Sequence, residues 1–430
     1  MRVSKRLTVA LVGALAVLVL GAVSALAAAP HASGPPLPTT DRFYTHSGSL
    51  KHIAPGTVLR TRTIALAGTT GSEPMSATQV LYRTTGELGQ PTVTVATIIR
   101  PTSQVGKTKI LSYQTAYDAL GAQCDPSYTL QGGNPSDSLG SAEEQIILGY
   151  VRAGDTVVVP DYEGERLDWI AGQESGYGTL DGIRAAERLL KVPAASTPVG
   201  MIGYSGGSDA TEFASELAPT YSPKLDIVGV AEGGIPVDLF HNTTYVNGSP
   251  VWSGTIPAVL VSLARAFYVN LAPYLSAYGV RVANQVKHEC IASFLGVYPG
   301  LTYQKLLKPK YHDVFKIPAF VKFTDPLIMS RTGTPKGPLF IGVGNSDGTG
   351  DGVMVTKDDE ALAHTYCKRG TSVQFNDYKG DDHTQAAVPF EAGAAAFLAA
   401  RLDGKPVPDG CNSIGAGNSL APLPVPRLAP

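Results

Sequence analysis

Five consecutive residues in this chain form the pattern expected around a nucleophilic serine. Residues Gly203–Gly207 read Gly-Tyr-Ser-Gly-Gly, after an apolar run at Pro198–Ile202 and before a helix-compatible stretch from Asp209. A G-x-S-x-G between a strand and a helix is typical of the nucleophile elbow, a sharp turn that exposes the serine hydroxyl. Glycines suit this turn because bulkier neighbours would clash. The pattern predicts Ser205 as the nucleophile, with the backbone N–H of Gly206 directed at a developing oxyanion.

A serine hydroxyl is a weak nucleophile and needs a histidine base with an orienting carboxylate. In α/β-hydrolases the acid follows the serine in the chain, and the histidine comes last. His383 ends a polar loop that follows a strand-like stretch at Ser372–Tyr378 and precedes a helix predicted from Phe390. We therefore predict His383 as the base. The remaining downstream histidines are less suitable: His364 falls within a predicted helix, and His241, His288 and His312 fall in a segment without obvious strands.

The acid is expected on the loop after the strand-like Leu339–Val343. That loop contains two aspartates, Asp347 and Asp351, among several glycines. A simple turn or a cation site would also use such a loop, but one short loop is too little to predict calcium binding. We favour Asp351, because the apolar residues that follow it could pack and fix the carboxylate. Asp347 is the alternative acid, since it lies closer to the end of the strand.

Segments of strand and helix character alternate along the chain and would position these residues. Early runs with alternating or β-branched residues predict antiparallel hairpins, at Val58–Ile64, Ala77–Thr84 and Thr92–Ile99. Short apolar runs typical of buried parallel strands follow at Lys109–Tyr113, Thr156–Pro160, Pro198–Gly203, Ile227–Ala231 and Pro338–Val343. Helices are predicted at Leu180–Leu190, Asp209–Leu217, Lys357–Cys367 and Phe390–Leu402. This alternation predicts an α/β-hydrolase fold with a mostly parallel central sheet.

Composition divides the chain into six segments. Residues 1–27 have a basic start, an apolar run and an A-x-A site, which predicts a cleavable signal peptide and a secreted protein. A membrane anchor is the alternative for this segment. An irregular arm (28–56) then leads into the hydrolase core (57–234 and 336–405), and a Pro/Gly-rich tail (406–430) ends the chain.

Residues 235–335 interrupt the strand–helix rhythm. Helix-like stretches occur at Val259–Ala272 and Ala283–Leu295, and no sheet strand is evident. We interpret this segment as a helical cap over the active site, which would exclude water and shape an acyl pocket. A helical subdomain that only adds core is the alternative.

Charge and cysteine content narrow the function classes further. The formal net charge is −2, so there is no basic footprint for nucleic acid. No segment after the signal peptide has 18 uninterrupted apolar residues, so we expect no transmembrane segment in the mature protein. The four cysteines, at neither C-x-x-C nor zinc spacing, predict two disulfides with three possible pairings. We expect neither a metal nor an organic cofactor.

Several segments together resemble the secretory lipase family typified by Candida antarctica lipase A. The resemblance covers most of residues 75–400 and occurs in the family's order. Besides the serine motif and the histidine loop Tyr378–His383, it involves Ser112–Asp118, Cys124–Tyr128, Pro160–Gly164 and Leu180–Ala185. At the acid, the family's short G-x-x-D-x-x-V-P is stretched here to Gly344–Val355 and lacks the proline. Both aspartates can be aligned across this insertion, so the resemblance leaves the choice of acid open.

The resemblance implies further roles. Asp118 would lie in the oxyanion hole with the Gly206 N–H, either protonated or using its backbone N–H, although a turn or helix-cap role is the simpler interpretation. The family's disulfide pairing would join Cys124 to Cys290 and Cys367 to Cys411. Residues 235–335 would form the acyl tunnel, and the substrates would be triacylglycerols and simpler esters.

We therefore expect a secreted, monomeric serine lipase or esterase that acts on lipid esters through Ser205, Asp351 and His383. Its partners would be a small-molecule or lipid ester substrate and, transiently, a lipid interface. Three alternatives use the same fold: an acyltransferase, a peptidase, and a non-catalytic lipid-binding homologue.

Overall fold

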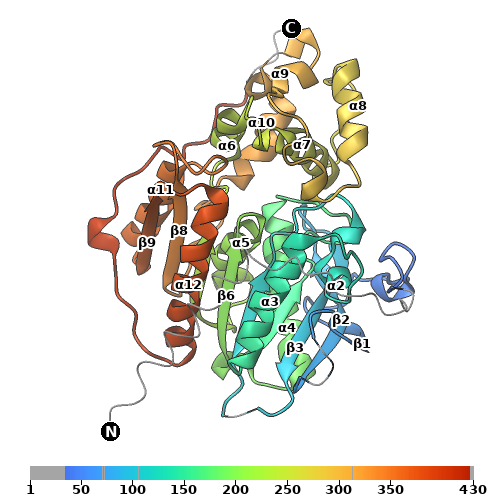
Figure 1. The fold of residues 1–430 in the computed structure, drawn as a ribbon, viewed down its shortest axis with the longest axis vertical. Coiled ribbons are helices and arrows are strands. Elements are labelled where there is room, and N and C mark those ends of the chain that lie inside the picture. The colour runs from blue at the N-terminus through green and yellow to red at the C-terminus, as the bar shows by residue number, and fades with distance from the viewer. Residues whose placement is uncertain (1–33, 70, 72, 105, 312, 427–430) are drawn as a thin grey trace, which may run out of the picture.

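A single nine-stranded sheet forms the centre of the molecule in this computed structural model, which describes residues 34–426 except 70, 72, 105 and 312 (Figure 1). The predicted signal peptide, residues 1–27, lies outside the described residues. The strands are β1 (Val58–Ile64), β2 (Met75–Thr85), β3 (Pro91–Pro101), β4 (Ile110–Gln114), β5 (Thr156–Pro160), β6 (Pro198–Tyr204), β7 (Asp226–Gly233), β8 (Leu339–Asn345) and β9 (Val373–Lys379). Their order in the sheet is β1-β2-β3-β5-β4-β6-β7-β8-β9.

The sheet changes from antiparallel to parallel at β5. Strands β1 to β3 pair as antiparallel neighbours, and β3 pairs antiparallel with β5. From β5 through β4, β6, β7 and β8 to β9 every pairing is parallel. The antiparallel hairpins, the parallel strands and the α/β-hydrolase class expected from the sequence are thereby confirmed.

Helices cover both faces of this sheet. Successive residues of a strand point to opposite faces, and on β3 Ile98 packs in one hydrophobic cluster while Ile99 packs in the other. The first cluster contains side chains of α4 (Gly172–Leu190) and α5 (Gly206–Tyr221), and the second contains side chains of α3 (Ser138–Arg152) and α12 (His383–Leu402). Two further helices of the core are α2 (Pro126–Thr129) and α11 (Thr356–Lys368).

Helix α4 begins eight residues before the predicted start at Leu180. Four glycines in its first eleven residues hide the helical periodicity, because glycine disfavours helices. Close packing on α5 requires two of them. A Cβ at Gly172 would lie 2.1 Å from the Phe213 ring, and one at Gly176 would lie 2.8 Å from the Phe213 backbone carbon.

Helix α12 also begins earlier than predicted, at His383 rather than Phe390. Asp382 caps it, accepting hydrogen bonds from the backbone N–H groups of Thr384 and Gln385, and the Gln385 side chain completes a capping box. Pro389 lies inside the helix and makes the sequence look like a helix start at Phe390. His383 is thus the first residue of a helix and not part of a free loop.

Residues 235–335, here called the helical insertion, contribute no strand to the described sheet. They form α6 (Leu239–Val246), α7 (Thr255–Ala266), α8 (Ala277–Val286), α9 (Tyr303–Leu306) and α10 (Pro318–Thr324), which group together in the upper part of Figure 1. The predicted helices Val259–Ala272 and Ala283–Leu295 are both too late in the sequence. Helix α7 ends where Tyr268 takes a positive φ of 55°, and α8 starts at a cap in which Ser276 accepts a hydrogen bond from the Gly279 N–H.

Two disulfides fasten the outer segments to the core. Cys124 bonds to Cys290 and thereby joins the loop after β4 to the helical insertion. Cys367 on α11 bonds to Cys411 and anchors the C-terminal segment. These are the pairs that the family resemblance implied.

Among the described helices, none combines the length and the apolar character that a membrane span requires.

Candidate active site

Ser205 occupies a tight turn between β6 and α5. Its φ of 56° and ψ of −125° lie in a region that is costly for a residue with a side chain. The neighbouring glycines make this turn possible. A Cβ at Gly203 would lie 2.2 Å from the Gly207 carbonyl oxygen, and a Cβ at Gly207 would lie 2.0 Å from the Gln114 carbonyl oxygen. The local backbone therefore has the strained strand-to-helix form that the motif predicts.

The Ser205 hydroxyl belongs to a hydrogen-bonded series of three side chains. Its Oγ lies 2.8 Å from Nε2 of His383, and Nδ1 of His383 lies 2.7 Å from Oδ2 of Asp351. The other carboxylate oxygen of Asp351 accepts hydrogen bonds from the backbone N–H groups of Val353 at 3.0 Å and Met354 at 2.7 Å. The carboxylate is buried and oriented by these bonds, so it can hold the imidazole with Nδ1 protonated and leave Nε2 free to accept a proton from the Ser205 hydroxyl.

The structure brings Asp351, and not Asp347, to His383. Asp347 is exposed, and its Oδ1 accepts hydrogen bonds from the backbone N–H groups of Thr349 at 2.8 Å and Gly350 at 3.0 Å. The Tyr245 hydroxyl donates to its Oδ2 at 2.9 Å. Asp347 thus stabilises the turn that presents Asp351, the carboxylate favoured from the sequence.

The imidazole of His383 is fixed by contacts that the sequence did not indicate. The ring of Trp252, from the helical insertion, meets it edge to face at a centroid distance of 5.2 Å. The Tyr204 ring lies 5.0 Å away on β6, and its hydroxyl donates to the His383 carbonyl at 2.6 Å. A Cβ at Gly234 would lie 2.8 Å from His383 Cε1. These groups lie far apart in the chain, and no local spacing relates them.

Asp118 is buried beside the Ser205 turn, after the carboxyl end of β4. A Cβ at Gly206 would lie 1.6 Å from its Oδ1, so only glycine fits there. The Trp169 indole N–H donates to the same oxygen at 2.9 Å. Burial raises the pKa of Asp118 to about 7, against the opposing effects of the Trp169 hydrogen bond and the His383 charge. The Asp118 carboxyl can therefore be protonated near neutral pH, and its O–H can then donate a hydrogen bond beside the Gly206 N–H.

A cavity of about 60 Å³ opens in front of Ser205. One side consists of core residues that include Asp118, Trp169 and Gly206, and the other consists mainly of apolar side chains of the helical insertion. The insertion residues are Pro236, Leu239, Asn242, Thr243, Val246, Trp252, Thr255, Ile256, Val259 and Ile291. The arrangement suits an apolar group held against a nucleophile.

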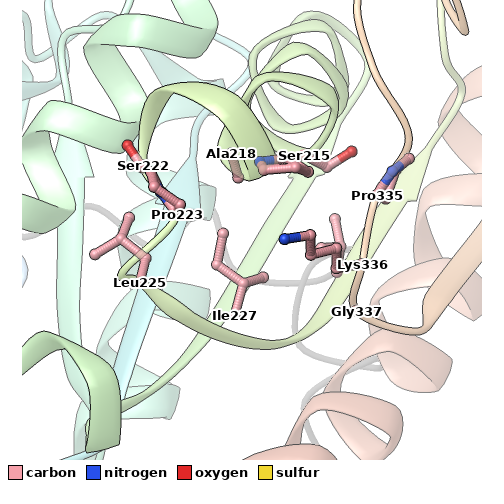
Figure 2. A pocket seen from close by; sticks show the side chains of 11 residues that line it. Ser215, Ala218, Ser222, Pro223, Leu225, Ile227, Pro335, Lys336 and Gly337 are labelled. Carbon is pink, nitrogen blue, oxygen red and sulfur yellow. The ribbon is translucent and has the colours of Figure 1, made fainter.

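A separate cavity of about 50 Å³ lies at the amino ends of β7 and β8, whereas Ser205 follows the carboxyl end of β6 (Figure 2). Leu225 and Ile227 line it near the start of β7, together with Pro335 and Lys336 from the segment before β8. Its lining contains no histidine, cysteine or carboxylate, and the Ser215 hydroxyl at its edge donates to the Glu212 carbonyl at 2.9 Å. It offers no catalytic group.

The other candidate histidines lie elsewhere. His241, on α6, is 3.0 Å from the carboxylate of Asp358, and His364 lies on α11 near the Ile414 carbonyl. His288 is exposed and lies two residues after the end of α8. His312 lies outside the described residues. Within the described ranges, no group of three or more histidine, cysteine or carboxylate side chains is arranged to hold a metal ion.

Comparisons with known proteins agree on one family. The family model described as "Secretory lipase" matches residues 134–410. Lipase A of Arthroderma benhamiae is 32% identical and covers 89% of this chain and 84% of its own length. A Mycobacterium tuberculosis protein named "Probable inactive lipase" is 34% identical and covers 87% of this chain and 84% of its own. The crystal structures of Candida antarctica lipase A superpose with TM-scores of 0.78 and 0.80, at 28% identity, and cover 92% of this chain and 91% of theirs.

Proposed function

This chain belongs to the secretory lipase family, and we propose that it is a secreted serine lipase or esterase that hydrolyses acylglycerols or simpler lipid esters. The hydrogen-bonded series from Ser205 through His383 to Asp351 is the observation that supports this proposal most strongly. The two disulfides agree with an oxidising compartment. The leader-like residues 1–27 provide a route of export.

In the proposed first step, Ser205 Oγ attacks the ester carbonyl carbon while His383 Nε2 takes the hydroxyl proton. Asp351 holds the imidazole in the tautomer that can accept this proton. The Gly206 N–H and the neutral Asp118 carboxyl stabilise the oxyanion, and one such donor is worth about 3–4 kcal/mol. Collapse of the tetrahedral intermediate breaks the ester C–O bond, and His383 returns its proton to the departing alcohol.

In the second step, a water molecule attacks the acyl-enzyme carbonyl while His383 again takes a proton. The acid is released and Ser205 is regenerated with its hydroxyl proton. The apolar wall of the helical insertion would hold the acyl group. The cavity of about 60 Å³ is much smaller than the roughly 300–1,000 Å³ of typical ligand pockets. A long acyl chain therefore requires side chains of the insertion to move.

A non-catalytic lipid-binding protein is the second candidate, because one of the relatives is named a probable inactive lipase. The presence of all three side chains of the series in this chain favours an active enzyme. Hydrolysis of p-nitrophenyl esters from acetate to palmitate, and of long-chain triacylglycerol, tests the choice with Ser205→Ala as control. We expect turnover by the native chain and its loss in Ser205→Ala. Equal rates for the two proteins would refute the proposal, and no turnover by the native chain would favour the binding protein.

A further inference from the structure

Three neighbouring strands bring their following loops to one edge of the sheet. β4 lies between β5 and β6 and pairs in parallel with both, so the carboxyl ends of these strands meet at that edge. Ser205 follows β6, Asp118 lies four residues after β4, and Glu163 lies three residues after β5. The loop that carries Glu163 is therefore a direct neighbour of the loop that carries Asp118.

The side chain of Glu163 holds the residue that follows Asp118. The backbone N–H of Ala119 donates to both carboxyl oxygens of Glu163, at 3.2 Å each. Glu163 and Ala119 are both fully buried, so water cannot take the place of this acceptor. Because a buried N–H without an acceptor is costly, the bond ties the backbone at residue 119 to the loop after β5.

A second bond of Glu163 reaches the residue that precedes Asp118. The backbone N–H of Glu163 donates to the Tyr117 hydroxyl at 2.7 Å. The Tyr117 ring also meets the Tyr162 ring edge to face, at a centroid distance of 4.9 Å. One residue thus holds both chain neighbours of Asp118 through hydrogen bonds. We call these two bonds, from the Ala119 N–H and to the Tyr117 hydroxyl, the Glu163 clamp.

Asp118 has a backbone conformation that needs such support. Its φ is 42°, and a positive φ in a residue with a Cβ persists only where the surrounding structure enforces it. The position of its carboxyl is also critical, because Oδ1 lies so near Gly206 that a Cβ there would be 1.6 Å away. The Trp169 indole N–H orients the carboxyl group, whereas the clamp holds the backbone on either side. A small shift of this backbone would move the carboxyl away from the Gly206 N–H.

The protonation of Glu163 suits a place beside an oxyanion. Burial raises the pKa of Glu163 well above its usual range, and the negative charge of Asp118 adds to this effect. The buried side chain therefore favours its neutral form, which adds no negative charge next to a developing oxyanion. A neutral carboxyl retains a carbonyl oxygen that can accept the Ala119 N–H.

We propose that Glu163 is a positioning residue of the oxyanion hole, whose clamp holds Asp118 where its carboxyl meets the oxyanion together with the Gly206 N–H. This inference rests on the proposed hydrolase function. Glu163 is not among the residues that line the catalytic cavity, so it does not touch the ester. Its effect on turnover is exerted through Asp118 alone.

Steady-state hydrolysis of p-nitrophenyl butyrate tests this positioning role. Glu163→Leu leaves the Ala119 N–H without its acceptor and should lower kcat at least tenfold, toward the roughly 100-fold that a misplacement of about 1 Å costs. KM should stay within about threefold, because the lost interaction is one that only the transition state uses. Glu163→Gln keeps a neutral carbonyl oxygen opposite the Ala119 N–H and should restore most of kcat. Equal kcat values for the leucine and glutamine variants would overturn the proposal.

A double-mutant cycle separates positioning from a general structural role. Asp118→Ala removes the group that the clamp serves, so adding Glu163→Leu to it should lower kcat by less than about twofold more. A second loss as large as the one in the native background would show that Glu163 acts independently of Asp118, and the proposal would fall. The matched control is Glu187→Leu, which removes a buried carboxyl near the end of α4, beside Arg184 and Arg188, and should keep native kcat.

Thermal melts verify that each variant is folded. Where Glu163→Leu does not fold, Tyr117→Phe tests the same clamp through its other bond, because it removes one hydroxyl and keeps the ring. It should lower kcat severalfold, and an unchanged kcat would overturn the clamp. Absence of turnover by the native chain would refute the hydrolase function itself, whereas native turnover that Glu163→Leu leaves unchanged would refute the positioning role alone.

Discussion

Replacing Asp351 by asparagine changes one atom of a buried side chain and should nevertheless remove nearly all hydrolytic activity. The structure dictates how the new amide must orient. Backbone N–H groups of Val353 and Met354 both point at Oδ1, so the amide oxygen has to take that position. The amide NH₂ then faces Nδ1 of His383, where the carboxylate oxygen had been at 2.7 Å.

The size of the effect follows from the tautomer. A donor opposite Nδ1 forces the neutral imidazole to keep its proton on Nε2, the nitrogen 2.8 Å from Ser205 Oγ. His383 can then no longer accept the hydroxyl proton in the first step. Loss of the correct tautomer in such a series costs about 10⁴-fold in kcat. That factor corresponds to about 5 kcal/mol of transition-state stabilisation.

Asp347→Asn is the matched control, four residues away on the same loop. Asp347 is exposed and an asparagine can still accept the N–H groups of Thr349 and Gly350. Its kcat should stay within about twofold of the native value, since surface changes of this kind cost little. Steady-state hydrolysis of a short p-nitrophenyl ester measures both variants, alongside thermal melts. Equal losses in the two variants, or a stronger loss in Asp347→Asn, would refute the assignment of the acid.

Three further predictions concern the surroundings of the site. Burial raises the pKa of Asp118 from its ordinary 3.8 to about 7, so the folded chain favours the neutral carboxyl more than the unfolded chain does. The contribution of this carboxyl to stability is therefore complete below pH 4 and should be lost as pH rises toward 7. Activity should fall above about pH 7, where the carboxyl ionises. Asp118→Asn cannot ionise, so its pH–rate profile should extend further to the alkaline side; an unchanged alkaline limb would exclude this carboxyl as its cause. Gly206→Ala should lower kcat at least tenfold, because its Cβ would lie 1.6 Å from Asp118 Oδ1, whereas Gly149→Ala on α3, where the new Cβ meets nothing within 4 Å, should keep full activity. Replacing both Cys367 and Cys411 by serine should lower the free energy of unfolding by about 2–4 kcal/mol, given a sequence separation of 44 residues, and denaturant titration would contradict this if the midpoint did not move.

Local patterns in the sequence were sufficient to predict the general fold and the turn that presents Ser205, the proposed nucleophile. Apolar runs of strand length between helical segments predicted the mixed sheet, because burial on both faces requires that pattern. The Ser205 turn was equally readable, since its steric demands fall on immediate neighbours such as Gly203 and Gly207. Helix starts were less predictable. The glycines that open α4 and the proline inside α12 disfavour a helix locally. Packing of α4 on the distant Phe213 and capping of α12 by the adjacent Asp382 outweigh that preference.

The neighbours of the proposed catalytic groups could be identified only in the folded molecule. Asp347 and Asp351 have similar residues around them, and the difference between them is how the loop after β8 meets the start of α12. The same holds for Trp252 and Trp169, which reach His383 and Asp118 from segments remote in sequence. Sequence spacing constrains the backbone over a few residues, whereas contacts between segments depend on how sheet, helices and insertion pack together. The sequence by itself therefore determined the class of fold and predicted Ser205 and His383 as the nucleophile and base that we propose, whereas tertiary packing decided which carboxylate contacts His383 and which groups enclose it.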